Sequence, residues 1–154
     1  MEETLGFNPN AKLEKYGIDP TRKLSASKQL LGFVGNISQV VRDNTFFRCV
    51  IYTSLHEQMV AMNIEAGDQL GYEVHPENDQ TFLIVEGTGK VDIDGSSQYL
   101  PVKPGDIIVV PAGNKHNVMA DQLNLKVLTI YSPPHHPYDR IQETHQDALE
   151  ENKY

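Results

Sequence analysis

The segment from Gly67 to Gly87 constrains the fold of this chain more than any other part of the sequence. Its hydrophobic pattern is typical of β-strands. Because successive side chains of a strand point to opposite faces, Glu73 and His75 are expected to lie on the same face. Gln80 follows His75 after a gap of four residues. The segment therefore predicts β-structure that carries a carboxylate, an imidazole and an amide.

A second segment of this kind runs from Gly105 to His116 and places another imidazole at a strand–turn–strand junction. Oxygen and nitrogen donors of these types form coordination shells for divalent metals. We therefore expect Glu73, His75, Gln80 and His116 to bind one divalent metal ion inside a β-barrel. Iron, manganese, nickel and zinc all accept such a set, and the residue types do not choose among them.

Two of these four residues have alternative roles. Glu73 lies two residues before a histidine and could instead face a substrate as a general base. Gln80 offers a neutral amide oxygen, which is a weak metal donor, so it could instead donate and accept hydrogen bonds beside the ligands. Asp79 would replace it if the turn shifted by one residue, although the alternation through Phe82 and Ile84 favours Gln80.

Short apolar runs separated by turn residues continue through most of the chain. Many short strands with glycine-rich turns are typical of all-β sandwiches and barrels. Asp94-Gly95, between two of these runs, predicts a tight hairpin of type I′. The expected strands are 46–52, 58–64, 69–74, 81–86, 90–93, 98–102, 107–110, 117–120 and 125–131.

The Gly67–Gly87 segment resembles the first sequence motif of the cupin family. That motif has glycine, five residues, His-x-His, three or four residues, glutamate, six residues and glycine. Gly67, Glu73, His75, Gln80 and Gly87 keep each of these intervals.

The second segment resembles the second cupin motif, which has glycine, five residues, Pro-x-Gly, two residues, histidine, three residues and asparagine. Gly105, Pro111, Gly113 and His116 match it, and Ala120 stands at the position of the final asparagine. The resemblance covers residues 46–131 and implies a single cupin jelly-roll β-barrel, also called a double-stranded β-helix. Cupins include isomerases, epimerases, dioxygenases, decarboxylases and metal-free binding proteins, so the resemblance alone implies no activity.

Two positions depart from the family pattern. Glu73 stands at the first histidine and Gln80 at the glutamate, so one formal negative charge still faces the metal. The Glu-x-His-Pro run that begins at Glu73 is also similar to the Gln-x-His-Pro run of type I phosphomannose isomerases, which are zinc-dependent cupins. The whole core is more similar to small bacterial cupins described as mannose-6-phosphate-isomerase-like. Glu-x-His, Asp-Gln and a Pro-Pro-His-His-Pro tail recur in that group.

The first 43 residues lie outside the β pattern and form an N-terminal extension. Apolar residues recur at helical spacing between residues 30 and 41, with Ser25 or Ser27 as the candidate N-cap. Two glycines weaken such a helix, so a strand or a broken helix remains an alternative. The apolar residues need a covering surface, because exposed apolar patches usually mark interfaces. We therefore expect the extension to pack on the barrel or on the partner subunit of a homodimer.

The barrel itself is expected to span residues 44–132, followed by a C-terminal region at 133–154. The run Pro133-Pro-His-His-Pro137 predicts an extended strap, because prolines exclude regular helix and central strand. We expect its two histidines on the surface, and an approach to the barrel opening is the alternative. Thr144 and Asp147 have the spacing of a capping box before a short helix.

Composition disfavours several classes of partner. The 154 residues include 13 Lys and Arg against 21 Asp and Glu, a formal net charge of −8, which disfavours nucleic acid and anionic membranes. No apolar run is long enough to span a membrane, and the acidic N-terminus does not resemble a secretory signal. The lone Cys49 lies in an apolar run and predicts a buried thiol. We expect a reducing, cytoplasmic location.

Together these observations predict a divalent-metal-binding cupin that acts on a small molecule. The favoured function is a small metalloenzyme for a polar metabolite such as a sugar or sugar phosphate, with isomerase-like or epimerase-like chemistry and Glu73 as the candidate catalytic residue. A non-catalytic cupin that binds a metal or a small molecule is the alternative. A non-haem Fe(II) dioxygenase is a further one, because two imidazoles and one carboxylate form the ligand set of such oxygenases.

Overall fold

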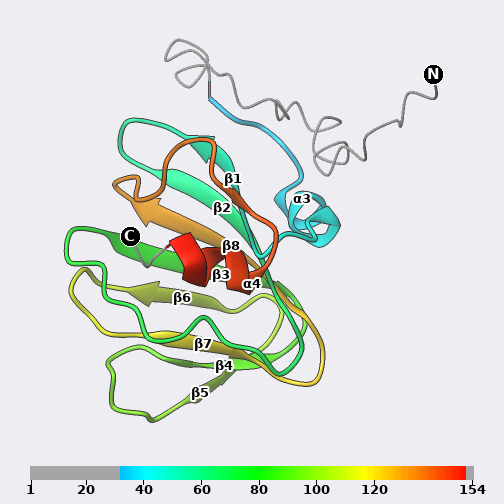
Figure 1. Cartoon of the computed structure of the whole chain (residues 1–154), viewed down its shortest axis with the longest axis vertical. Helices are drawn as coiled ribbons and strands as arrows, with labels where there is room; N and C mark the ends of the chain where they lie inside the picture. The colour runs from blue at the N-terminus through cyan, green and yellow to red at the C-terminus, as the bar shows by residue number, and fades with distance from the viewer. Residues whose placement is uncertain (1–31, 152–154) are drawn as a thin grey trace.

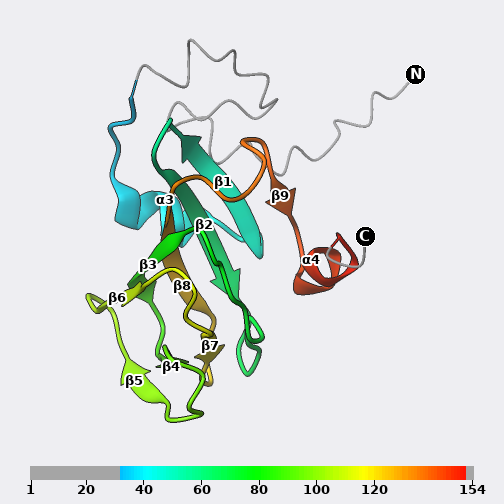
Figure 2. The same ribbon diagram turned by 90° about the vertical axis from the view of Figure 1, so that its left-hand side faces the viewer.

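The computed structural model describes residues 32–151, which form two antiparallel sheets around a common core (Figure 1, Figure 2). The large sheet has the order β6-β3-β8-β2-β1-β9 and the small sheet the order β5-β4-β7. The strands are β1 (Arg48–Thr53), β2 (Gln58–Ile64), β3 (Asp79–Glu86), β4 (Gly89–Asp92), β5 (Leu100–Val102), β6 (Ile107–Val110), β7 (Asn117–Ala120), β8 (Leu125–Ser132) and β9 (Ile141–Gln142).

This arrangement confirms the expected all-β jelly roll. Each predicted strand except the one at 69–74 overlaps an observed strand. Burial alternates along β3, where Gln80, Phe82 and Ile84 are buried and point to the same side. This side faces the core between the two sheets, which therefore contains polar residues as well as apolar ones.

The segment 69–74 is not a strand, contrary to the prediction. Gly71 has a φ of +85°, a left-handed conformation that interrupts an extended backbone. The segment still lies against residues 116–119, because Gln69 bridges Met119 and Glu73 bridges His116 as isolated antiparallel pairs.

A second apolar cluster lies on the outer face of the large sheet and is covered by helix α3 (Ile37–Asp43). Val40 and Val41 of this helix are fully buried there beside Cys49, which confirms the predicted buried thiol. The helix begins later than predicted. Asn36 is its N-cap and accepts a hydrogen bond from the Gln39 N–H at 3.1 Å.

Residues 32–36 are therefore not helical, and Gly32 has a φ of +84°. The expected caps Ser25 and Ser27 lie outside the described residues. Phe33 packs against the outer cluster, whereas Val34 is almost completely exposed. The homodimer expected from this apolar set stays a prediction.

The connection between β4 and β5 is longer than the predicted two-residue hairpin, because it spans residues 93–99. The Asp92 carboxylate organises this loop by accepting hydrogen bonds from the backbone N–H groups of Asp94, Gly95 and Ser97 at 2.9–3.2 Å. A side-chain acceptor of this kind stabilises a wider turn than Asp-Gly alone would make.

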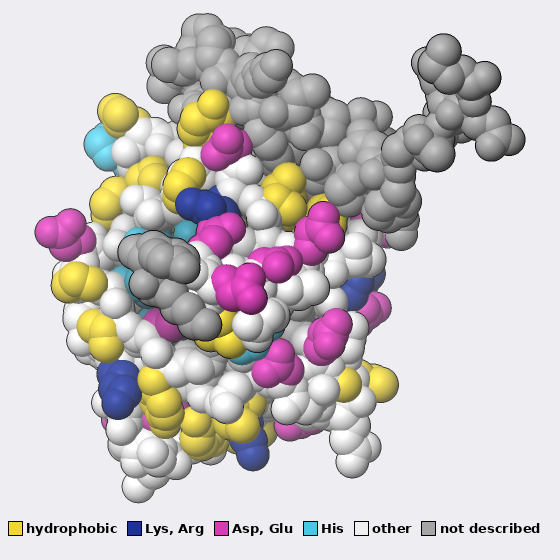
Figure 3. All heavy atoms as spheres, viewed as in Figure 1, with side chains coloured by type: hydrophobic (Ala, Val, Ile, Leu, Met, Phe, Trp, Pro, Cys, Tyr) yellow, Lys and Arg dark blue, Asp and Glu magenta, His cyan; other side chains and the backbone are white. Residues whose placement is uncertain are grey.

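The C-terminal region packs along the barrel. β9, which the sequence did not predict, pairs with β1 and precedes helix α4 (His145–Glu151). The capping box is confirmed, since the Thr144 N–H donates to Asp147 and the Asp147 N–H donates to the Thr144 hydroxyl. Acidic side chains gather over α4 (Figure 3). No helix among residues 32–151 is long and apolar enough to cross a membrane.

We predict that the two glycines at the ends of the 67–87 segment differ in their tolerance of alanine. Both have left-handed backbones, with φ of +76° at Gly67 and +83° at Gly87. A Cβ at Gly67 meets nothing within 4 Å, whereas one at Gly87 lies 2.3 Å from the backbone oxygen of Asn124. Gly67→Ala should lower the free energy of unfolding by roughly 1–2 kcal/mol, the cost of left-handed backbone, and Gly87→Ala by clearly more. Chemical denaturation measures both, and equal losses would contradict the prediction.

Candidate metal centre

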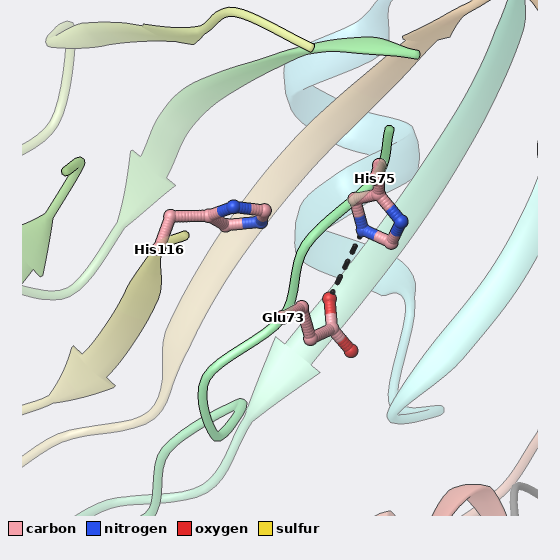
Figure 4. Close-up of side chains that lie close together, drawn as sticks. All are labelled: Glu73, His75 and His116. Carbon is pink, nitrogen blue, oxygen red and sulfur yellow. Dashed lines mark hydrogen bonds and ion pairs between the residues drawn. The ribbon is translucent and has the colours of Figure 1, made fainter. Parts of the chain in front are cut away.

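Glu73, His75 and His116 point toward one another inside the barrel (Figure 4). Each offers one ligand atom, and these atoms all lie within 4.8 Å of one another. Glu73 and His75 come from the irregular segment after Gly71, and His116 immediately precedes β7. These three are the residues of the expected ligand set that carry an imidazole or a carboxylate. Their arrangement is consistent with a site for one metal ion.

Backbone hydrogen bonds hold the two segments together. The Glu73 N–H donates to the His116 carbonyl and the His116 N–H donates to the Glu73 carbonyl, both at 3.0 Å. The Gly113 N–H donates to the His75 carbonyl at 2.9 Å. His75 therefore stays beside the turn that leads to His116, although no regular strand passes through it.

His116 is prepared to act as a ligand through one nitrogen. Its Nδ1 lies 3.0 Å from the carbonyl oxygen of Asn114. A carbonyl can only accept, so Nδ1 carries the proton and Nε2 keeps its lone pair. Nε2 is buried and has no hydrogen-bond partner among the described residues. Burial lowers the pKa of His116, so the ring stays neutral, as metal binding requires.

Glu73 is held in its ionised form. Burial acts to raise its pKa, but the hydrogen bond from His75 and the positive charge of Arg48 outweigh that effect and lower it. Its Oε2 lies 3.3 Å from Nε2 of His75, and its Oε1 lies 3.8 Å from a guanidinium nitrogen of Arg48. A carboxylate with a lowered pKa is ionised and available to bind a cation, whereas the same shift makes it a weaker base toward a substrate.

Gln80 faces the barrel interior, as the alternation of its strand predicts. It is 1% exposed, and neither its amide oxygen nor its amide nitrogen has a partner among the described residues. Asp79, the alternative residue, is exposed, and its carboxylate accepts the Ala112 N–H at 2.9 Å. The register shift that would have brought Asp79 into the site does not occur.

The C-terminal strap approaches the barrel opening, as the alternative expectation has it, although His135 remains exposed and His136 is half-buried. The ring of His135 lies 4.4 Å from that of His75, measured between centroids. His136 packs edge-on against Tyr131, with its Nε2 3.3 Å from the tyrosine hydroxyl. The strap therefore brings two further imidazoles next to the candidate centre.

Two buried amides hold the strap in this position. Gln58 of β2 donates to the His136 carbonyl at 2.8 Å and accepts the N–H groups of His135 and His136 at 3.2 and 2.9 Å. Asn78 donates to the Pro133 carbonyl at 2.6 Å. Side chains of the barrel thus supply the hydrogen bonds that an irregular, proline-rich segment cannot make with itself.

Sequence reasoning missed Arg48 and Gln58, because each lies in a strand without a charged or amide motif around it. The inward and outward alternation of side chains along each strand could have identified them. It puts an arginine at an inward position of β1 and a glutamine at an inward position of β2. Lys115, next to His116 in the sequence, is the cation nearest the site along the chain but does not enter it. It is exposed, and its amine lies over the ring of Tyr72, 4.8 Å from the centroid.

We predict that His136 makes the folded protein sensitive to acid. Burial and the nearby charge of Arg48 lower its pKa to about 2, against about 6.5 in an unfolded chain. Below about pH 6.5 the unfolded chain therefore takes up a proton that the folded chain refuses, so stability falls by up to ~1.4 kcal/mol per pH unit.

His136→Gln removes this titration. Denaturation at constant metal content between pH 8 and pH 5 should show a shallower loss of stability in the variant than in the wild type, whereas His56→Gln, at an exposed histidine, should keep the wild-type slope. Parallel stability curves for the wild type and His136→Gln would contradict the prediction.

Comparisons with known proteins place the fold and the site in context. Residues 60–131 match the model of the cupin domain. The chain is 38% identical over 122 residues to the uncharacterized protein YrkC of Bacillus subtilis, covering 76% of this chain and 66% of that protein, just under two thirds of its length. It is 36% identical over 81 residues to acireductone dioxygenase 1 of Physcomitrium patens, covering 48% of this chain and 42% of that enzyme.

A crystal structure supports the same relationship. BH2720 from Bacillus halodurans superimposes with a TM-score of 0.73 at 35% identity, covering 77% of this chain and 93% of that one. The match of sequence, fold and motif positions shows that the chain belongs to the cupin family.

Proposed function

We propose that Glu73, His75 and His116 hold one divalent metal ion and that the Gln80 amide oxygen is a fourth donor. The observation that carries this proposal is the buried Nε2 of His116, which has no partner among the described residues, on a ring that offers a ligand atom within 4.8 Å of those of Glu73 and His75. An unpartnered buried nitrogen is costly in a folded protein, and a metal ion would satisfy it. The same argument applies to the unpartnered oxygen of Gln80.

The donor set fits several ions. Two imidazole nitrogens and one carboxylate oxygen suit iron, manganese, nickel or zinc, and a neutral amide changes none of these preferences. When bound, such an ion supplies Lewis-acid polarisation of a carbonyl or hydroxyl oxygen. The three firm donors leave further coordination positions open for a ligand.

We infer that the protein is a small metalloenzyme for a polar metabolite such as a sugar or sugar phosphate. The polar inner face of the large sheet supports this inference, since the side-chain polar atoms of Gln80 and Thr129 are buried there without a partner in residues 32–151. Glu73 would bind the metal through one oxygen, which its lowered pKa favours by keeping the carboxylate ionised, and the alternative role is to move a proton on the substrate. His135, whose ring meets that of His75 edge-on at the opening, would contact the bound metabolite.

A dioxygenase is the second candidate, supported by two observations. Two histidines and one carboxylate are the ligand set of non-haem Fe(II) oxygenases. A relative at 36% identity over 81 residues is named acireductone dioxygenase 1. A non-catalytic cupin that captures a small molecule is the remaining candidate. Activity assays with a panel of aldose and ketose phosphates, run beside Fe(II)-dependent oxygen uptake, separate the three.

We predict that the double variant His75→Ala/His116→Ala loses the metal. Gently purified wild-type protein should contain close to one divalent ion per chain by elemental analysis, and the variant should contain almost none, because only Glu73 and a neutral amide remain. A matched control is His56→Ala/His145→Ala, which removes two histidines outside the site and should keep the metal. Retention of stoichiometric metal by the His75/His116 variant would refute the site.

Glu73→Gln is predicted to separate the two roles of this carboxylate. If Glu73 is a ligand, the variant should bind metal at least about tenfold more weakly, because the site loses its formal negative charge. If Glu73 is a base, metal should stay bound while turnover falls by about 10²–10⁴-fold. Competition with a chelator gives the affinity and the assay panel gives the rate.

The control for Glu73→Gln is Glu77→Gln, at an exposed position of the same segment, which should change neither quantity. Unchanged metal affinity and unchanged turnover in Glu73→Gln would exclude both roles.

A further inference from the structure

The interior of the barrel contains buried polar atoms that the metal site does not use. Arg48 Nε, the amide nitrogen of Gln80 and the hydroxyl oxygen of Thr129 have no partner among the described residues. Their side chains are at least nine-tenths buried, with exposures of 4%, 1% and 0%. Leaving such groups unpaired destabilises a folded protein, so each requires a reason.

The three residues occupy inward positions of one sheet. Gln80 lies on β3 and Thr129 on the adjacent β8, where Thr129 faces Phe82, two residues along from Gln80. Arg48 lies on β1 and pairs with Met62, which belongs to the same core cluster as Phe82. The Arg48 guanidinium reaches across to Glu73, 3.8 Å from Oε1, so it extends toward the candidate metal centre.

The chemistry of these groups favours one kind of ligand. Arg48 Nε and the Gln80 nitrogen can only donate hydrogen bonds, and the Thr129 hydroxyl can donate one. A ligand that pairs with them must bring acceptor oxygens. Arg48 is also permanently charged, and guanidinium groups match the geometry of carboxylate and phosphate oxygens.

The balance of charges in the site also favours an anionic ligand, and this step rests on the metal site proposed above. Arg48 and Glu73 cancel each other, and metal-bound imidazoles are neutral. A divalent ion would therefore leave two positive charges uncompensated in a buried site. Uncompensated charge in a protein interior is unfavourable, and an anionic ligand removes it.

We propose that the barrel interior beside the metal centre binds the oxyanion group of a small metabolite, a carboxylate or a phosphate, through Arg48, Gln80 and Thr129. The anion lies against the inner face of the large sheet. The rest of the metabolite extends toward the metal centre and the His135 strap. Thr129 is thus a ligand-binding residue, and Arg48 donates its unpaired Nε to the ligand while its other guanidinium nitrogens contact Glu73 and Gln142.

Thr129→Val gives the sharpest test, because valine has nearly the same shape and lacks the hydroxyl. If the hydroxyl serves only a ligand, ligand-free Thr129→Val should be as stable as the wild type or more stable, since it removes an unpaired buried group. The metal-loaded variant should bind the oxyanion roughly three- to tenfold more weakly. Thr81→Val, on the other face of β3, is the control and should leave anion affinity unchanged.

Calorimetry on the metal-loaded protein, with metal content checked by elemental analysis, measures this with three probes. Malonate tests carboxylates, inorganic phosphate tests phosphates, and malonamide is the neutral comparison. We expect one of the two anions to bind at least tenfold more tightly than malonamide, and the tighter one identifies the source of the oxyanion. Binding of all three with equal affinity, or of none, would overturn the proposal.

Arg48→Gln is the second variant, with Arg42→Gln on α3 as a control of equal charge change. Arg48→Gln should abolish the preference for the anion over malonamide while one metal ion per chain is retained. Normal anion affinity in both Thr129→Val and Arg48→Gln would also overturn the proposal. Loss of metal in the wild type itself would instead refute the metal site, so the two failures are distinguishable.

Discussion

The pair of backbone hydrogen bonds between Glu73 and His116 is the constraint on which the candidate site depends. Both bonds are 3.0 Å long, and they join two segments that are otherwise irregular at this point. Residues paired in this way place their side chains close together, so one bridge fixes a carboxylate opposite an imidazole. The bond from Gly113 to the His75 carbonyl then adds the third residue. Backbone geometry, more than side-chain packing, assembles the site.

A comparison of two glutamines shows how the barrel divides its polar interior between structure and ligand. Gln58 and Gln80 lie directly opposite Tyr131 on its two neighbouring strands, and both are buried. Gln58 uses its whole amide to hold the strap and Thr53. Gln80 uses none of its amide on the described residues. Identical side chains in equivalent positions therefore differ in function because only one of them has a backbone segment within reach.

The sequence could predict the features that depend on local periodicity. Strand alternation placed Gln80 inward, and the capping box at Thr144 formed as expected. The prediction was wrong where a side chain next to a turn changes the length of that turn. Asp92 widens the Asp94-Gly95 connection. The position of the strap could not be predicted either. Its prolines show that Pro133–Pro137 is irregular, but they do not show which side chains of the barrel will bind it.

The C-terminal region explains why membership of the family does not define the activity. Arg48 accompanies Glu73 and donates a hydrogen bond to Gln142 of β9, and Gln142 in turn donates to Glu151 at the end of α4. His135 covers His75 from the same region. Except for Glu73 and His75, these residues lie outside the matched cupin domain at 60–131. Relatives that share only that domain can therefore share the metal ligands and still differ in the surrounding residues that select the metabolite.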